Sequence, residues 1–183
     1  LAPLTMPAAG PEVSQQILEL LKKENISFHG LNKTISVDPK KLKFEDGEAE
    51  FDLLLAVPPH KVPQVVCDSG FAETGKFIQV NRDCKTVYDE VYAIGDVTNM
   101  IVTDNMTVPK AGIFAENQGI MVAKNIVARI KNEKEAAIFD GKGGCFVEMG
   151  DDNAGYVEVD MFAKPNPITL SGLEPLIITP DSN

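Results

Sequence analysis

The residues best suited to chemistry in this chain lie in one stretch, Val91 to Val122. Its first part is a short apolar run that ends at Gly95-Asp96, and after a polar loop the chain restarts as a helix entered through Pro109. In α/β proteins, a buried strand followed by a loop and a helix presents a polar group and a helix N-terminus to one ligand. We therefore expect the functional site here, with the helix continuing to about Lys131.

Asp96 has two interpretations from its position alone. It is a turn former after Gly95, which is the usual role of a lone aspartate in a loop. Alternatively, its carboxylate accepts hydrogen bonds from ligand hydroxyls at the carboxyl end of a buried strand. Composition and spacing favour neither interpretation.

The helix carries small residues along one side, a stripe formed by Gly112, Ala115, Gly119 and Ala123. Glycine inside a helix costs about 1 kcal/mol relative to alanine, so two glycines on one face need a compensating reason. Close approach of a flat ligand, a strand or a neighbouring helix would supply it. Helix–sheet packing without any ligand explains the stripe equally well.

The composition restricts the classes of partner. The 183 residues include 27 Asp and Glu against 17 Lys and Arg, which gives a net charge of −10. Such a chain repels phosphate backbones, so we expect no nucleic-acid partner. The sequence has no run of about 18 apolar residues that would predict a membrane span. Cys67, Cys84 and Cys145 are widely spaced without a CxxC pair, which indicates free thiols in a reducing compartment.

The first third of the chain predicts a helix followed by short strands. The helix covers residues 11–24, and strands follow at 26–29 and 34–37. Asp46-Gly47 predicts a two-residue hairpin turn between arms at 41–45 and 48–57. Within the second arm, Phe51 to Val57 is apolar except for Asp52, which predicts a strand buried on both faces. Pro58-Pro59 stops this strand and marks the first domain boundary.

The rest of the sequence predicts further elements before and after the stretch from Val91 to Val122. A strand is expected at 77–80, and a hairpin joins strands at 145–149 and 156–162 through a turn at 150–155. The proline-rich tail, residues 165–183, predicts little regular structure. A shift in composition at 132–135 marks the second domain boundary.

Several segments of the sequence resemble one family of flavoproteins. The string TVYDEVYAIGDV (86–97) resembles the second flavin-binding motif of flavoproteins with two dinucleotide-binding domains. Together with VPKAGIFAENQG (108–119), it is similar to the sulfide:quinone oxidoreductase and flavocytochrome c sulfide dehydrogenase branch of the pyridine nucleotide-disulfide oxidoreductases. Three further segments, at 9–29, 48–60 and 143–159, resemble that branch in the same order along the chain.

The resemblance implies an α/β fold and a division into three parts. The fold is a partial FAD/NAD(P)-binding fold of the two-dinucleotide-binding-domain type, with a small antiparallel C-terminal sheet. Residues 1–59 correspond to the later part of the second, NAD-like nucleotide-binding domain. Residues 60–134 correspond to the C-terminal return segment of the FAD domain, and residues 135–183 form a small C-terminal domain and tail.

The resemblance also implies roles for individual residues toward FAD. Asp96 binds the ribityl chain, and Gly95 lets the backbone approach it. Lys110, Ala111 and Gly112 lie near the pyrimidine side of the ring, where the helix N-terminus and the lysine charge stabilise the anionic reduced flavin. Cys145 corresponds to a redox cysteine that relays sulfur to the flavin in sulfide oxidases, while an inert core cysteine is the alternative. We expect no metal site.

Two departures from the family pattern limit what the chain can do alone. No GxGxxG strand–turn–helix for the FAD pyrophosphate occurs in the sequence, and GKGG at 141–144 lacks the last glycine and the following helix. We therefore expect a C-terminal portion of a longer FAD-dependent oxidoreductase, inactive and free of FAD without its missing N-terminal half. Residues 165–183 also lack the amphipathic pattern by which membrane-bound members of the family reach quinone.

These observations define the expected function and its alternatives. The parent enzyme passes electrons from sulfide or another donor through FAD to a quinone or cytochrome acceptor, in the cytoplasm or at the inner face of the membrane. A type 2 NADH dehydrogenase and a coenzyme A disulfide reductase are the alternatives among enzymes. A non-enzymatic domain that self-associates through the small-residue stripe is the contrasting hypothesis, and homo-oligomerisation of the fragment is expected under both views.

Overall fold

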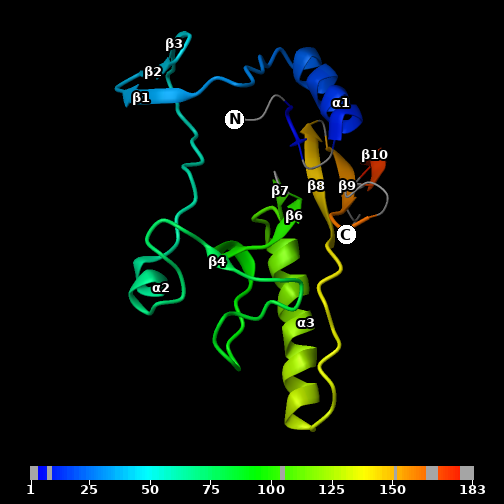
Figure 1. Ribbon diagram of the computed structural model, residues 1–183. Coiled ribbons are helices and arrows are strands. Elements are labelled where there is room, and N and C mark those ends of the chain that lie inside the picture. The colour runs from blue at the N-terminus through cyan, green and yellow to red at the C-terminus, as the bar shows by residue number, and fades with distance from the viewer. Residues whose placement is uncertain (1–3, 8–9, 104–105, 151, 164–168, 178–183) are drawn as a thin grey trace, which may run out of the picture. The chain divides into compact units, whose positions relative to one another are not determined.

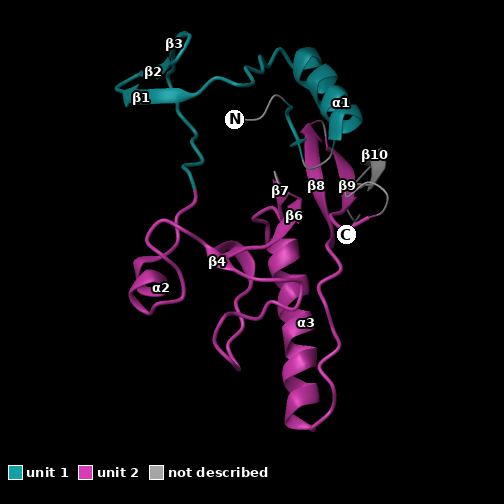
Figure 2. Cartoon of the chain, viewed as in Figure 1, with its two compact units in different colours: residues 1–59 teal, residues 60–183 magenta. Residues whose placement is uncertain are grey.

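The computed structural model describes residues 4–7, 10–103, 106–150, 152–163 and 169–177. The chain forms two compact units, residues 1–59 and residues 60–183 (Figure 2). The division falls after Pro59, and the assignment of the parts to nucleotide-binding and small C-terminal domains stays a prediction. Among the described residues, none of the helices combines the length and apolar character that crossing a membrane requires.

The first unit begins with helix α1 (Gly10–Lys23), which agrees with the helix predicted over residues 11–24. Glu12 lies in the first turn and Lys22 and Lys23 lie in the last, so both ends complement the helix dipole. At the C-terminus, Asn25 adopts a positive φ of 56° and the Ile26 amide donates to Leu21 O at 2.8 Å. This six-residue closing hydrogen bond ends the helix and satisfies one of its last carbonyls.

The strand predicted at residues 26–29 is not formed, because the Ile26 amide closes α1 instead of joining a sheet. The strands of this unit are β1 (Thr34–Asp38), β2 (Lys41–Phe44) and β3 (Gly47–Glu50), paired antiparallel in that order (Figure 1). Phe44 pairs with Gly47, so the two-residue turn is Glu45-Asp46, one residue earlier than predicted. Gly47 takes a φ of +145° at the start of β3.

The predicted strand from Phe51 to Val57 is wrong. Beyond Glu50 the chain leaves the sheet, and Leu53, Leu55 and Val57 are 76%, 86% and 87% exposed. A strand requires a neighbour for its backbone groups, and within the described residues no strand pairs with this segment. The apolar residues of this segment therefore do not form a buried strand in this unit.

The second unit is organised around helix α3 (Gly112–Ile130), as the sequence predicts (Figure 1). Short elements precede it: α2 (Gln64–Asp68), β4 (Ile78–Gln79), the 3-10 turn η2 (Gly95–Val97), β5 (Thr98–Asn99), β6 (Ile101–Thr103) and β7 (Met106–Thr107). β4 pairs parallel with β5, and β6 pairs antiparallel with β7. The predicted strand at 77–80 is therefore present as β4.

The apolar run Val91 to Ile94 does not form the predicted buried strand. Its only ladder contact among the described residues is an isolated antiparallel bridge between Tyr92 and Lys85, and Ile94 is 38% exposed. The Ala93 amide donates to Cys84 O at 2.9 Å, so this segment doubles back on the residues just before it. Residues 91–94 thus form an extended segment that leads into η2.

The C-terminal sheet contains β8 (Lys142–Gly150), β9 (Asn153–Asp160) and β10 (Thr169–Ile177), with β9 in the centre. The predicted hairpin at 145–162 is confirmed, with a tighter turn than expected. The prediction of little regular structure in the tail is wrong for β10, because β9 offers a free edge for backbone pairing. The register shifts between Ser171 and Glu174, next to Pro175, as expected of a strand that contains proline. Residues 165–168 and 178–183 of that tail lie outside the described residues.

The core of the second unit joins α3 to the chain that follows it. Phe139 is 1% exposed and forms edge-on ring contacts with Phe114 and Phe162 at centroid distances of 6.1 and 6.3 Å. Asn125, buried in α3, donates to Ala137 O at 2.9 Å and accepts from the Ala137 amide at 3.0 Å. These contacts hold residues 137–139 along the helix and lead the chain into β8.

Gly143 allows β8 to approach the first turn of α3. A Cβ at this position would lie 2.6 Å from Phe114 Cε1 and 3.2 Å from Ile113 Cγ2. We predict that Gly143→Ala lowers the free energy of unfolding by about 1–3 kcal/mol, because the Phe114 ring is buried and cannot move freely. Urea denaturation of the two proteins measures this difference.

Gly112→Ala is the matched control, because a Cβ at Gly112 would meet nothing within 4 Å. Since alanine favours the helix by up to about 1 kcal/mol, this variant should be as stable as the parent or slightly more stable. Equal denaturation midpoints for Gly143→Ala and the parent would contradict the close approach of β8 to α3.

Candidate functional site

Gly95 brings the loop after the extended segment onto the side of α3. Its φ is +69°, and a Cβ here would lie 3.2 Å from Ala115 Cβ. The Gly95 amide donates to Gln118 Oε1 at 2.7 Å, and Thr98 Oγ1 donates to Gly95 O at 2.8 Å. Both the positive φ and the short approach require glycine at this position.

The small-residue stripe of α3 faces this segment. Ala115 lies against Gly95, and a Cβ at Gly119 would lie 3.5 Å from Ile94 Cδ1. The sequence left open whether a ligand, a strand or a helix approaches the small-residue stripe. In the structure, residues 94–95 of the chain itself lie against Ala115 and Gly119. Gly112 at the start of the stripe faces open space.

Lys110 ties the loop to the residues that enter α3. Its ammonium donates to Asp96 O at 2.7 Å and Thr98 O at 2.8 Å, and lies 3.7 Å from the centroid of the Phe77 ring. Two carbonyls and an aromatic face thus occupy the surroundings of its three N–H groups. Burial lowers the pKa of Lys110, and the nearby Asp96 carboxylate opposes that shift. The charge stays next to Asp96 without a direct ion pair.

Asp96 and the start of α3 leave hydrogen-bonding groups open. The Asp96 residue is exposed, and within the described part of the chain its carboxylate has no hydrogen-bond partner. Ala111 is the N-cap residue of α3 and provides no side-chain cap. Within the described residues, no group accepts a hydrogen bond from the backbone amides of Gly112 and Ile113. An unpaired carboxylate and unpaired helix N–H groups therefore lie at one end of α3.

The structure brings most of the predicted site residues together. Gly95, Asp96, Lys110 and Ala111 line one small cavity of about 10 Å³, and Gly112 directly follows Ala111 in the chain. The remaining lining residues are Thr98, Val108, Pro109, Phe114, Ala115 and Gln118.

Cys145 does not line this cavity. It is exposed on β8, opposite Val157 of β9. Because side chains alternate along a strand, Cys145 shares a face with Gly143, the residue that approaches Phe114 and Ile113. The thiol therefore lies on the face of the sheet that meets the first turn of α3.

The other two cysteines differ from Cys145. Cys84 is fully buried, and burial together with the Asp83 carboxylate raises its pKa to about 12. Its thiol is therefore protonated at neutral pH and is a poor nucleophile. Cys67 is half-buried, and its thiol donates to Glu73 O at 3.7 Å.

Sequence reasoning missed Gln118, which holds the Gly95 amide. Gln118 is 2% exposed although it is a polar residue in the middle of a helix. Its position three residues after Ala115, on the side that carries the small stripe, was the signal that could have identified it.

Sequence reasoning also missed a network of charged side chains centred on Glu135. Lys85 and Tyr92 are partners in the isolated bridge, and both side chains donate to Glu135 Oε2 at 2.7 Å. Arg129 of α3 lies 3.6 Å from Glu135 Oε1 and 2.8 Å from Glu90. The network attaches the segment that leads to Gly95 to the end of α3.

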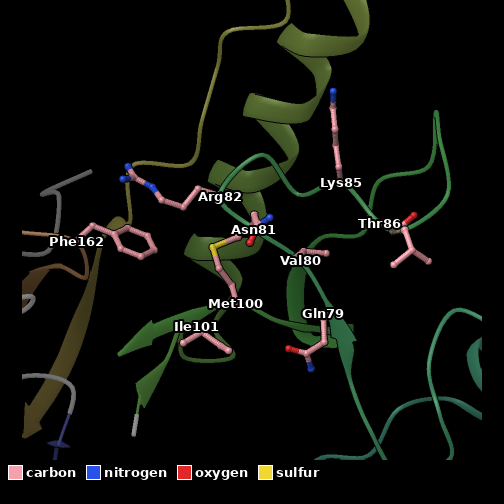
Figure 3. A pocket seen from close by; sticks show the side chains of 10 residues that line it. Gln79, Val80, Asn81, Arg82, Lys85, Thr86, Met100, Ile101 and Phe162 are labelled. Carbon is pink, nitrogen blue, oxygen red and sulfur yellow. The ribbon is translucent and has the colours of Figure 1, made fainter. Parts of the chain in front are cut away.

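A wider groove of about 590 Å³ lies beside β4 and β6 and contains none of the predicted site residues (Figure 3). Arg82 lines it, but its Nε donates to Phe139 O at 2.7 Å and its guanidinium lies 4.3 Å from the Phe162 ring centroid. Lys85 points away from the other labelled side chains in Figure 3 and pairs with Glu135. The cations of this groove are thus occupied by contacts within the unit.

Comparison with known proteins decides the family. A model of the family described as pyridine nucleotide-disulphide oxidoreductase matches residues 1–132. The chain belongs to this family. Its members are FAD-dependent oxidoreductases with an FAD/NAD(P)-binding α/β fold, as the sequence resemblance implied.

Individual relatives agree with this assignment. The chain is 25% identical over 170 residues to a sulfide-quinone reductase of Aquifex aeolicus (strain VF5), which covers 85% of the chain and 39% of that protein. It is similar in fold to the ferredoxin reductase for the CYP199A2 system from Rhodopseudomonas palustris, with a TM-score of 0.62 and 20% identity over 88% of the chain and 40% of that protein.

A chain in the Tetrahymena thermophila mitochondrial ATP synthase tetramer shows a similar fold, with a TM-score of 0.63 and 18% identity over 85% of this chain and 38% of that one. This chain therefore spans about two fifths of the length of these relatives.

The Glu135 network gives a pH-dependent prediction. The hydrogen bond from Lys85, followed by that from Tyr92, lowers the pKa of Glu135 from 4.5, and the same pairing raises the pKa of Lys85 from 10.5. The contribution of Glu135 to stability is therefore complete above pH 4.5 and is lost as the pH falls through the folded-state pKa. We predict that Glu135→Gln lowers the urea midpoint at about pH 7, and that this difference disappears in acid.

Glu133→Gln is the control, because Glu133 is exposed and forms no ion pair within the described residues. It should leave the midpoint unchanged throughout this pH range. A Glu135→Gln difference that stays constant down to about pH 3 would contradict the charge network.

Proposed function

We propose that this chain supplies the flavin-facing side of an FAD site in an FAD-dependent oxidoreductase. The observation that carries the proposal is the convergence of Gly95-Asp96 with the entry to α3, where Lys110 joins the two segments. Asp96 lines one small cavity and provides an unpaired acceptor, and the unpaired first amides of α3 directly follow Ala111, which lines the same cavity. Ribityl hydroxyls and a flavin carbonyl have the complementary chemistry.

Each residue has a distinct part in this proposal. Asp96 accepts hydrogen bonds from the ribityl hydroxyls, and Gly95 lets the backbone come close to the cofactor. The amides at the start of α3 favour negative charge on the pyrimidine side of the ring. Lys110 places its positive charge close to the cofactor, while its ammonium group donates hydrogen bonds to the Asp96 and Thr98 carbonyls. When bound, FAD supplies transfer of electrons between a donor and an acceptor.

The pyrophosphate side of the cofactor requires a further segment. We infer that a GxGxxG strand–turn–helix supplies it, and that the 183 residues alone are inactive and bind no FAD. Sequencing the gene upstream tests this inference: an in-frame GxGxxG about 150 to 200 residues before Leu1, a distance expected for one further domain, would support it. One FAD bound to each isolated chain would contradict it.

The Asp96 carboxylate is the most direct point at which to test FAD binding. We predict that Asp96→Ala in the natural full-length protein weakens FAD binding about 10- to 100-fold, as expected for lost hydrogen bonds to a charged acceptor. Fluorescence titration of the apoprotein with FAD measures the Kd.

Glu116→Ala is the control, since Glu116 is another exposed carboxylate, located on α3 away from the cavity lining. It should leave the Kd unchanged. An unaltered Kd for Asp96→Ala would remove Asp96 from the site.

For the reaction of the whole enzyme, we propose sulfide as donor and a quinone or cytochrome as acceptor. The similarity to a sulfide-quinone reductase supports this choice. Cys145 supports it further, because its exposed thiol lies on the sheet face that meets the first turn of α3. In this role the Cys145 sulfur would form a bond to the sulfur of sulfide, with two protons released to solvent and two electrons passed to the bound FAD, which would be the oxidant.

Substitution of Cys145 tests the donor. We predict that Cys145→Ala in the full-length protein slows sulfide-dependent flavin bleaching at least about 10-fold without changing flavin content, because the nucleophile is lost. Stopped-flow absorbance follows the bleaching, and Cys67→Ala is the control. A bleaching rate equal to that of the parent would assign Cys145 to a structural role.

A further inference from the structure

The side-chain amide of Gln118 accepts a hydrogen bond through its oxygen, while its nitrogen has no partner among the described residues. Its Oε1 accepts from the Gly95 amide at 2.7 Å, and this bond fixes which way the side-chain amide points. The Nε2 group then points elsewhere, and within the described residues it has no hydrogen-bond partner. Gln118 is nonetheless 98% buried, with a relative exposure of 2%.

The Gln118 residue lies at the cavity at the entry to α3. Gln118 lines this cavity together with Asp96 and Ala111. The cavity volume of about 10 Å³ is close to the space of one water molecule. Among the described residues, no side-chain nitrogen or oxygen is both fully buried and without a hydrogen-bond partner. The Gln118 Nε2 atom is therefore accessible to water, and an acceptor oxygen can reach it.

Two independent features thus point into the same small space. Asp96 of the loop carries an unpaired carboxylate and Gln118 of α3 carries an open amide donor, and both residues line the cavity. An acceptor oxygen that enters satisfies the buried amide, and the same side chain stays bonded to Gly95 through Oε1. Gln118 therefore links the position of the Gly95-Asp96 loop to the presence of a ligand oxygen.

We propose that Gln118 is a ligand-contacting residue that donates its Nε2–H to an oxygen acceptor of the bound flavin nucleotide. This inference rests on the proposed function. Without the nucleotide, a single water molecule takes the place of that oxygen. The side chain thereby performs two separable tasks, holding the loop through Oε1 and binding the cofactor through Nε2.

Two substitutions separate these tasks in the natural full-length protein. Gln118→Glu keeps an oxygen for the Gly95 amide but replaces the donor with a second acceptor, while Gln118→Met removes both. We expect Gln118→Glu at pH 8 to weaken FAD binding about 10-fold or more, with hydrogen exchange of the Gly95 amide equal to that of the parent. We expect Gln118→Met to weaken binding and also to accelerate exchange at Gly95.

A control separates the loss of the donor from the added charge. Asn117→Asp places the same charge on the neighbouring residue, whose side chain donates to Lys142 O at 3.0 Å. This variant should bind FAD as the parent does. If it weakens binding as much as Gln118→Glu, the effect is one of charge and the proposal is overturned.

The remaining outcomes also decide the proposal. A parental Kd for Gln118→Glu, or a Gln118→Glu protein with the fast Gly95 exchange of Gln118→Met, would reduce Gln118 to a structural role and overturn the inference. Absence of FAD binding by the parent protein would instead contradict the proposed function. The two failures are therefore distinguishable.

Discussion

The attachment of the 95–98 loop to α3 is the constraint on which the candidate site depends. The Gly95 amide is held by Gln118 from one side, and the carbonyls of Asp96 and Thr98 are held by Lys110 from the other. These bonds are possible only because glycine and alanine let the loop and the helix come within van der Waals distance. The backbone of Asp96 is fixed in this way, while its carboxylate stays free to meet a ligand.

The rest of the second unit supports α3 along its length. At the N-terminal end, Gly143 allows β8 to meet Phe114. In the middle, Asn125 binds the backbone of Ala137, and at the C-terminal end the Glu135 network attaches the segment that leads into the loop. The helix is thus the common support of both the loop and the sheet that carries Cys145, which explains how residues about fifty positions apart could serve one cofactor.

Local patterns in the sequence predicted the elements that local interactions form. Helices α1 and α3 follow from periodicity and terminal residues, and the β8–β9 hairpin follows from two strands around a polar turn. The apolar runs at 51–57 and 91–94 failed as strands because pairing depends on neighbours that a run of residues does not specify. Gly95, Asp96, Lys110 and Ala111 were predicted as a group and do line one cavity. Gln118 was missed because its position beside the small-residue stripe does not by itself reveal its bond to the Gly95 amide, which lies 23 residues earlier in the chain.

Amide hydrogen exchange of the natural full-length protein, with and without FAD, tests most directly whether this region is the flavin-facing side of the site. We predict that FAD slows exchange at Gly95 and Asp96 and at the first amides of α3, Gly112 and Ile113. Exchange along the groove at residues 79–82 should be unaffected at its exposed amides. Protection elsewhere, with unchanged exchange at Gly95 and Gly112, would contradict the assignment of this region to the flavin.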